Sequence, residues 1–285
     1  MNVIRVVPSG YCKGVVNAIE LVKKTRVEYP DEKIYVLGMI VHNSFVTKEL
    51  EELGIITLDD SQKTKEELLD TIDDGIVVFT AHGISEKLKN KAISKGLKYI
   101  DATCEDVLKT QELTKKYINN GYDVLYLGKK NHPEANAVLS ISNRIHLLTC
   151  IEDLDKFNIN NDKLMLTCQT TMSSLELKDL INAVQIKYPN IDIKNDICLA
   201  TSSRQKAIMD LKDCELLYIV GDIKSNNTNM LKEIAIKSGI PKVRLISNYQ
   251  DINDLDLTVD KVYVSAGAST PPTLINEVIK YLELK

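Results

Sequence analysis

Three of the six cysteines in this sequence occupy equivalent places. Cys12, Cys104 and Cys198 stand at nearly equal intervals, and each follows a short β-branched run and precedes a stretch with helical periodicity. Unpaired N–H groups and the positive dipole end at the start of a helix favour a thiolate there. Three thiolates that meet at one point repel one another unless they bind a metal centre, so we expect these cysteines to be metal ligands.

The spacing of these cysteines narrows the choice of metal. Structural zinc usually has four ligands, with pairs close together in the sequence, whereas these three cysteines are far apart. A cubane iron–sulfur cluster usually takes four cysteines, so a cluster with three keeps one iron open. An open iron is what a catalytic cluster needs. We therefore favour one iron–sulfur cluster per chain and keep zinc as the alternative.

The other cysteines do not follow this pattern. Cys150 comes after a plain strand and Cys214 before one, and we expect both to be small buried apolar residues. Cys168 stands shortly before Thr170 in a polar turn. We expect Cys168 to pack in the core or behind the metal site.

Polar residues mark the predicted turns between strands and helices. His42, His82 and His132 lie in such turns, whereas His146 lies inside a plain strand and is expected to be structural. Five further residues occupy equivalent turns: Thr170, Ser225, Asn226, Asn227 and Ser269. Each alone is an ordinary helix-capping residue. Together, imidazoles, hydroxyls and amides at helix N-termini suit a phosphate or diphosphate, and protonated His42 or His82 can add positive charge.

Glu134 is the carboxylate with the clearest chemical opportunity. It follows His132 and Pro133 at the start of a predicted helix, where the dipole stabilises its charged form. Bound anions nearby would instead raise its pKa and allow it to give a proton to a reacting group. The alternative is a surface acid in the first turn of a helix.

The turns belong to a pattern that recurs three times. Each third of the chain opens with a strand, a cysteine turn and a helix, and two further strand–turn–helix units follow, separated by a plain strand. The plain strands are Ile55–Leu58, Ile145–Leu148 and Val243–Ile246. We expect an α/β protein of three similar small domains with mainly parallel sheets, over residues 13–103, 104–197 and 198–285. Binding groups gather where such strands end, so a pseudo-threefold arrangement would direct the turns toward one central cluster.

Composition argues against several classes of protein. Of the 285 residues, 44% are hydrophobic and 27% charged, the balance of a globular protein. The net charge is −4, and no basic block favours nucleic acid. No stretch approaches the ~18 apolar residues of a membrane span, and the N-terminal apolar run is too short for a signal peptide. We expect a cytoplasmic protein with reduced cysteines that binds neither nucleic acid nor membrane.

The motifs, taken in this order, resemble the 4-hydroxy-3-methylbut-2-enyl diphosphate reductase (LytB) family over essentially the whole chain. They surround the predicted ligands and turns: Gly10-Tyr11-Cys12-Lys13-Gly14-Val15, Ile40-Val41-His42-Asn43, Ala81-His82-Gly83, Asp101-Ala102-Thr103-Cys104, His132-Pro133-Glu134, Gln169-Thr170-Thr171, Ile197-Cys198 with Ala200-Thr201 and Arg204-Gln205, Ser225 with Asn227-Thr228, and Ala268-Ser269-Thr270-Pro271. Any one of these motifs alone would be weak, but together they are specific.

The resemblance implies an enzyme of the non-mevalonate isoprenoid pathway. Three α/β domains would surround a [4Fe–4S] cluster held by Cys12, Cys104 and Cys198, and residues 1–12 would join the sheet of the third domain. The enzyme would remove the allylic hydroxyl reductively and give isopentenyl and dimethylallyl diphosphates. Glu134 and Thr170 would handle that hydroxyl, with Glu134 as the proton source. The residues implied in substrate binding are His42, His82, His132, Thr170, Ser225, Asn227 and Ser269.

This sequence departs from the family pattern at a few positions. Cys168 stands where Thr is usual, Glu105 where Pro is usual, Asn226 where Ser is usual and Asp222 where Gly is common. Asn226 could still donate to a phosphate. None of these departures removes a predicted cluster ligand or the predicted proton donor.

The electrons would have to come from a partner. No Gly-x-Gly-x-x-Gly motif follows a strand, so we expect no built-in nicotinamide or flavin site. An external ferredoxin, or a flavodoxin with its reductase, would serve. Two other functions stay open: a cluster hydro-lyase, which needs no reductant, and a cluster-based redox sensor, which needs no Glu134.

Overall fold

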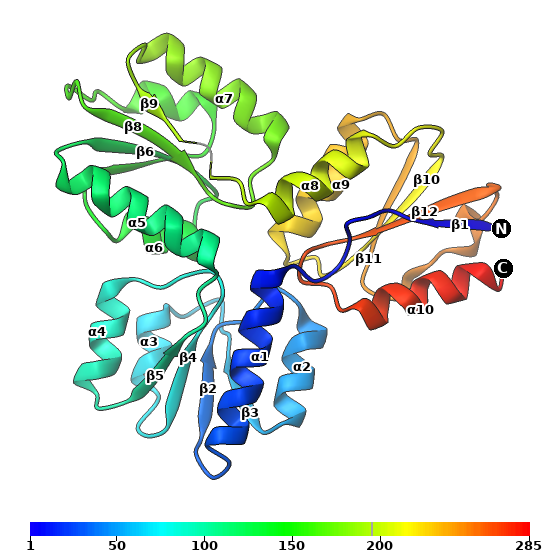
Figure 1. Ribbon diagram of the computed structural model, residues 1–285, viewed down its shortest axis with the longest axis horizontal. Coiled ribbons are helices and arrows are strands. Elements are labelled where there is room, and N and C mark those ends of the chain that lie inside the picture. The colour runs from blue at the N-terminus through cyan, green and yellow to red at the C-terminus, as the bar shows by residue number, and fades with distance from the viewer. Residues whose placement is uncertain (195) are drawn as a thin grey trace. The chain divides into compact units, whose positions relative to one another are not determined.

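The computed structural model, which describes residues 1–194 and 196–285, contains three four-stranded sheets (Figure 1). Every strand pair that it describes is parallel. The strand orders are β1(Asn2–Arg5)-β12(Lys261–Ala266)-β10(Leu216–Val220)-β11(Lys242–Ile246), β3(Ile55–Leu58)-β2(Ile34–Leu37)-β4(Ile76–Phe79)-β5(Lys98–Asp101), and β7(Ile145–Leu148)-β6(Asp123–Leu127)-β8(Leu164–Cys168)-β9(Asp192–Ile193). The prediction of three similar α/β domains with parallel sheets is confirmed.

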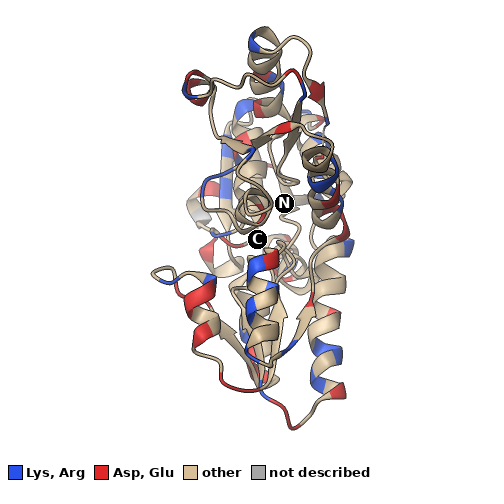
Figure 2. Ribbon diagram, turned by 90° about the vertical axis from the view of Figure 1, so that its left-hand side faces the viewer, with Lys and Arg blue, Asp and Glu red and all other residues tan. Residues whose placement is uncertain are grey.

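Helices connect the parallel strands, as parallel pairing requires. The helices are α1(Lys13–Glu28), α2(Ser44–Glu52), α3(Lys65–Asp70), α4(Glu86–Ser94), α5(Glu105–Asn119), α6(Pro133–Leu139), α7(Ser174–Lys187), α8(Leu199–Met209), α9(Asn226–Lys237) and α10(Pro272–Glu283). Short 3₁₀ helices are η1(Ile151–Lys156), η2(Tyr249–Asp251) and η3(Asp254–Asp256). Figure 2 shows acidic and basic residues interspersed along the chain. No helix in the described part of the chain has both the length and the apolar character needed to cross a membrane.

The central strands are continuous apolar runs because both of their faces are covered. In the sheet β7-β6-β8-β9, Tyr126 of β6 packs in a cluster with Ile118 of α5 and Val138 of α6. The neighbouring Leu125 packs on the opposite face with Leu177 of α7. Figure 1 shows α7 on one face of this sheet and α5 and α6 on the other. Successive side chains of a strand point to opposite faces of the sheet and so bind a layer of helices on each face. The turns that connect strands to helices lie at the ends of the strands.

The chain divides into two compact units. Unit 1 comprises residues 1–16, 42–46 and 198–285 and contains the sheet β1-β12-β10-β11. Within it the first strand of the chain pairs with the last, with Val3 opposite Val262. Unit 2 comprises residues 17–41 and 47–197 and contains the other two sheets. The domain boundaries 13–103, 104–197 and 198–285 and the pseudo-threefold arrangement stay predictions.

Two local predictions need correction. The plain strand predicted over Val243–Ile246 begins one residue earlier, since β11 spans Lys242–Ile246. Asn227 was expected in a turn, but it lies in the first turn of α9, because the Ser225 hydroxyl accepts the Thr228 N–H (3.3 Å) and caps the helix two residues earlier.

Candidate active-site residues and family relationship

Glu134 is buried and bound to Thr170 in unit 2. It lies in the first turn of α6, after the His132 cap and Pro133. Only 2% of the residue is exposed to solvent. The two carboxylate oxygens accept the N–H (2.7 Å) and the hydroxyl (3.0 Å) of Thr170, in the turn after β8. The alternative of a surface acid is therefore wrong. Glu134 and Thr170 are the two residues predicted to handle a hydroxyl group, and they are in direct contact.

Burial changes the acidity of Glu134. Removal from water raises the pKa of its carboxyl group to about 7, and the two hydrogen bonds from Thr170 oppose this effect. Asp196 nearby raises the pKa further. The sequence predicted the direction of this shift from bound anions, but the fold alone produces it. Near neutral pH, Glu134 exists in both protonated and ionised forms, as proton transfer requires.

Two histidines lie beside this pair. The Glu134 N–H donates to His132 Nδ1 (3.2 Å), so the neutral His132 ring carries its hydrogen on Nε2. The rings of His82 and His132 meet edge to face, with centroids 5.9 Å apart. The Thr80 hydroxyl is 3.2 Å from His82 Nδ1. The turns after β4, β6 and β8 thus bring His82, His132, Glu134 and Thr170 together.

Cys104 belongs to the same edge of unit 2. It is the N-cap of α5, and its N–H donates to the carbonyl of Ala81 (3.0 Å), next to His82. Gly83 has φ of +93°, and a Cβ there would lie 2.5 Å from Gln111 Nε2 of α5. Only glycine allows so close an approach between the His82 turn and the helix that Cys104 begins.

In unit 1, a chain of hydrogen bonds links Cys12 to Cys198. The Cys12 N–H donates to the Ala268 carbonyl (3.1 Å), and the Ala268 N–H donates to Asn227 Oδ1 (2.9 Å). Asn227 Nδ2 donates to the Thr201 hydroxyl (3.3 Å). The Cys198 thiol lies 3.1 Å from that hydroxyl and accepts the Thr201 N–H (3.4 Å). Two of the predicted metal ligands are therefore held by the predicted substrate-binding turns.

The remaining predicted binding residues also lie in unit 1. Ser225 caps α9, and Asn226 and Asn227 form the first turn of that helix; all three are buried. The Ser269 hydroxyl, after β12, donates to the carbonyl of His42 (3.0 Å). Hydroxyl and amide groups thus gather at the N-terminus of α9, where an anion is favoured.

Sequence reasoning missed roles for two cations. Arg204, only 4% exposed, donates to the carbonyls of Gly10 (2.5 Å) and Ala200 (2.7 Å). Burial lowers the pKa of Arg204, and the thiols of Cys12 and Cys198 act in the opposite direction, so the guanidinium stands near both. The Arg204-Gln205 motif was the signal for it.

Lys65, the second cation, begins α3. A Cβ on Gly38 would lie 3.9 Å from its Nζ and 3.7 Å from Thr80 Cγ2, so this ammonium reaches the turn that carries His82. Burial lowers the pKa of Lys65 to about 8. No sequence pattern predicted this placement of Lys65, because α3 lies outside every motif.

The other cysteines separate into two environments. Burial raises the pKa of the Cys168 thiol to about 12 and that of Cys214 to about 11, so both remain thiols. The prediction of a buried Cys214 is correct. The prediction for Cys150 is wrong, because it is exposed at the cap of η1, where the chain leaves the sheet after β7.

The fourth histidine, His146, lies in β7, and its Nε2 is 3.4 Å from Asp123 Oδ1.

The donor set suits a thiolate-bound cluster. Cys12, Cys104 and Cys198 form no disulfide and are half-buried, and each directly precedes the first residue of a helix: α1, α5 and α8. Cys12 and Cys198 belong to unit 1 and Cys104 to unit 2. Among residues 1–194 and 196–285, no group of three or more His, Cys, Asp or Glu side chains is arranged to hold a metal ion. The assignment of a cluster to these thiols stays a prediction that their chemistry supports.

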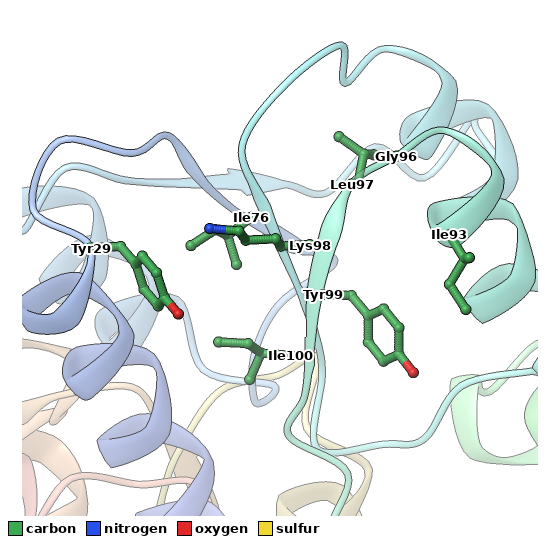
Figure 3. Close-up of a pocket in the computed structure, with 8 residues that line it drawn as sticks. All are labelled: Tyr29, Ile76, Ile93, Gly96, Leu97, Lys98, Tyr99 and Ile100. Carbon is green, nitrogen blue, oxygen red and sulfur yellow. The ribbon is translucent and has the colours of Figure 1, made fainter.

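A cavity of about 530 Å³ lies along the edge strand β5 (Figure 3). Figure 3 shows Tyr99 and Ile93 on one side of this strand and Tyr29 and Lys98 on the other. The Lys98 ammonium stands 4.9 Å from the centre of the Tyr29 ring. None of the predicted site residues lines this cavity, so it is separate from the polar turns.

Comparisons with known proteins agree on one family. The model of the family described as LytB protein matches residues 3–283. The 4-hydroxy-3-methylbut-2-enyl diphosphate reductase of Geobacillus kaustophilus is 42% identical over 290 residues, which cover 99% of this chain and 90% of the relative. The protein of the same name from Lysinibacillus sphaericus is 40% identical over 291 residues and is covered to 88%.

Solved structures extend the similarity to the fold. The E-1-hydroxy-2-methyl-but-2-enyl-4-diphosphate reductase from Plasmodium falciparum has a TM-score of 0.90 at 31% identity, over 99% of this chain and 87% of that one. A second structure, of (E)-4-hydroxy-3-methyl-but-2-enyl diphosphate reductase, the terminal enzyme of the non-mevalonate pathway, has a TM-score of 0.71 at 27% identity. That similarity covers both chains completely.

Proposed function

The chain belongs to the LytB protein family, and on this premise we propose that it is an oxidoreductase that converts 4-hydroxy-3-methylbut-2-enyl diphosphate to isopentenyl and dimethylallyl diphosphates. The observation that carries the proposal is the buried Glu134–Thr170 pair, at the same edge of unit 2 as His82, His132 and Cys104. Relatives named for this reductase match nearly the whole chain.

In this proposal Cys12, Cys104 and Cys198 hold one [4Fe–4S] cluster per chain. When bound, such a cluster supplies the electrons for reduction and a Lewis-acidic iron with an open position. The protein contributes a helix N-terminus beside each thiolate, which offsets part of the negative charge. Arg204, near Cys12 and Cys198, adds a full positive charge.

The protein's main chemical task is the supply of protons. Reductive removal of a hydroxyl group consumes two electrons and two protons: the C–O bond breaks, a C–H bond forms, and the hydroxyl leaves as water. Hydroxide is a poor leaving group, so a proton must reach the oxygen as the bond breaks. Glu134, with a pKa of about 7, holds such a proton at neutral pH, and Thr170 fixes the orientation of its carboxyl group.

The substrate's diphosphate would be bound by neutral donors and imidazoles. We assign this role to the predicted set His42, His82, His132, Thr170, Ser225, Asn226, Asn227 and Ser269. Ser225, Asn226 and Asn227 form the N-terminus of α9, where backbone N–H groups and the helix dipole favour an anion. Such fixed dipoles bind a diphosphate without requiring lysine or arginine in the same turns.

The proposal includes a partner and a location. Electrons would come from a ferredoxin, or from a flavodoxin with its reductase. We place the protein in the cytoplasm, because none of the six cysteines forms a disulfide, the state that a reducing compartment maintains. The three domains would span residues 13–103, 104–197 and 198–285, with the first strand added to the sheet of the third.

Anaerobic purification followed by an activity assay tests the proposal. We expect a brown protein with about four irons per chain, which converts the substrate only when a low-potential reductant is present. Glu134→Gln should keep the iron and lower kcat by about 10²–10⁴-fold, because a carboxamide is not acidic enough to transfer a proton at neutral pH. Turnover without a reductant would indicate a hydro-lyase instead, and full activity of E134Q would remove Glu134 from the mechanism.

A further inference from the structure

Asp222 makes three hydrogen bonds that join distant parts of unit 1. It follows β10, and the residue is only 9% exposed. One carboxylate oxygen accepts the N–H (2.8 Å) and the hydroxyl (2.7 Å) of Ser44. The other oxygen accepts the N–H of Lys224 (2.8 Å). A single carboxylate thus shapes its own turn and binds the segment 42–46.

The segment 42–46 begins helix α2, and Asp222 completes its capping. Asn43 Oδ1 accepts the N–H groups of Phe45 (3.0 Å) and Val46 (3.3 Å). The Ser44 N–H has Asp222 as its acceptor. Helix N-termini leave such donors unpaired and carry a partial positive charge, so a carboxylate is favoured there on both counts. A residue from another part of the chain therefore stabilises the start of α2.

His42 is fixed from two sides by this arrangement. Its carbonyl accepts the Ser269 hydroxyl (3.0 Å) from the turn after β12, and Ser44 is bound by Asp222 from the turn after β10. The latter turn leads directly to Ser225 and Asn227 of α9. Asp222 is thus the link between the segment that carries His42 and the helix N-terminus that carries the amide donors.

A carboxylate so close to a proposed diphosphate site needs compensation. Burial by itself would raise the pKa of Asp222, but the hydrogen bonds from Lys224 and Ser44 outweigh it and hold the pKa below its usual value. The carboxylate therefore stays ionised at neutral pH. The N-terminus of α2 and the three hydrogen-bond donors offset its negative charge, which reduces its repulsion of a nearby anion.

We propose that Asp222 is a positioning residue for diphosphate binding. From the turn after β10 it caps α2, and it thereby holds His42 in a fixed position relative to Ser225 and Asn227. The inference rests on the proposed function, in which these three residues bind the diphosphate. It predicts that loss of Asp222 loosens the segment 42–46 and weakens binding, while the proton chemistry at Glu134 is unaffected.

The test compares D222A with D251A in the anaerobically purified enzyme. Asp251 is the matched control, because its carboxylate accepts the N–H groups of Ser247 (2.7 Å) and Asn248 (3.4 Å) at η2, in the same unit. For D222A we expect the KM for 4-hydroxy-3-methylbut-2-enyl diphosphate to rise about tenfold, with kcat within about twofold of wild type. Hydrogen exchange of the Ser44 amide should accelerate. D251A should change neither the KM nor the hydrogen exchange of the Ser44 amide.

Two further measurements keep the inference separate from the proposed function. The Kd of inorganic diphosphate, measured without turnover, should rise in D222A as the KM does, and D222N, which keeps one acceptor oxygen, should lie between D222A and wild type. An unchanged Kd in D222A, or a fall in kcat without a change in KM, would overturn the positioning role. If wild type binds inorganic diphosphate but reduces no substrate, the proposed function fails and the Kd comparison still decides the role of Asp222.

Discussion

Glu134 experiences two opposing influences at the scale of a single residue. Burial favours its neutral form, whereas the N–H and hydroxyl groups of Thr170 favour the carboxylate. Burial dominates, and the pKa rises from 4.5 to about 7. An acid with this pKa can deliver a proton at neutral pH and be reprotonated afterwards, which is the behaviour that the proposed reaction requires.

The same shift makes the protein's stability depend on pH. In the unfolded chain Glu134 ionises near 4.5, but in the folded state it ionises near 7, so folded protein binds more protons between these values. Stability therefore falls as pH rises through this window, by up to roughly 3 kcal/mol at 1.36 kcal/mol per pKa unit. E134Q has no such group. We expect the difference in unfolding free energy, E134Q minus wild type, to grow between pH 5 and pH 8.

Urea unfolding at several pH values measures this difference. Glu277, an exposed residue of α10, supplies the control, because E277Q removes a carboxyl group that lies at the surface instead of one that is buried. All other titrating groups are shared and cancel in the comparison. A difference between E134Q and wild type that stays constant from pH 5 to pH 8 would show that Glu134 titrates normally.

The start of α6 next to Glu134 was predictable, but the burial of the Glu134 side chain was not. Pro133 is favoured in the first turn of a helix, and His132 supplies the cap, so local sequence sets this boundary. Thr170 lies at the end of another strand, and only the pairing of β6 with β8 brings it to Glu134. The prediction for Cys150 was wrong for the same reason: local sequence does not determine burial. Its exposure depends on the path of η1 after the strand.

At the scale of the elements, the plain strands were the easiest to predict. Ile55–Leu58 and Ile145–Leu148 form β3 and β7 with the predicted bounds, because short apolar runs between polar turns have few alternatives. Helix ends were less certain. Leu211 continues the apolar periodicity of α8, yet the helix ends at Met209 with Asp210 as its C-cap. Periodicity locates the buried face of a helix but not its last residue.

Gly83 provides a test of how closely two elements must approach. It has φ of +93°, and an added Cβ would meet Gln111 Nε2 at 2.5 Å and Val107 Cγ1 at 3.0 Å, both from α5. Gly96 has φ of +72° with nothing within 4 Å of the same position. We expect G96A to cost about 1–2 kcal/mol through backbone strain alone. G83A should cost about 1–3 kcal/mol more, since the buried side chains of Gln111 and Val107 must also shift.

Denaturant unfolding of both variants separates strain from crowding. Because α5 begins at Cys104, G83A should also lower the iron content of the purified protein, whereas G96A should not. Equal losses of stability in the two variants would mean that the His82 turn does not depend on close contact with α5.

At the scale of the whole molecule, the repeat was visible in the sequence but the partners of the strands were not. Equal spacing of three strand–turn–helix units predicts three similar sheets, and the described residues form three four-stranded parallel sheets. The pairing of Asn2–Arg5 with Lys261–Ala266 joins the two ends of the chain. No periodicity encodes that partner, so it came only from the family resemblance. The turn that carries Asp222 and the segment 42–46 likewise meet through contacts that no local pattern encodes.

Removal of each cysteine tests whether the repeat builds one shared centre. Cys12 and Cys198 are linked through Ala268, Asn227 and Thr201 in unit 1, and Cys104 caps α5 in unit 2. If all three bind one cluster, C12S, C104S and C198S should each lose most of the iron and nearly all activity, despite these different surroundings. C150S and C214S should keep both, because one thiol is exposed outside the turns and the other is buried with a raised pKa.

Iron analysis after anaerobic purification decides whether the three cysteines share one cluster, with thermal unfolding as a check that each variant is folded. A folded C104S protein with full iron content would restrict the metal centre to the two cysteines of unit 1, and the proposed three-thiolate cluster would be wrong.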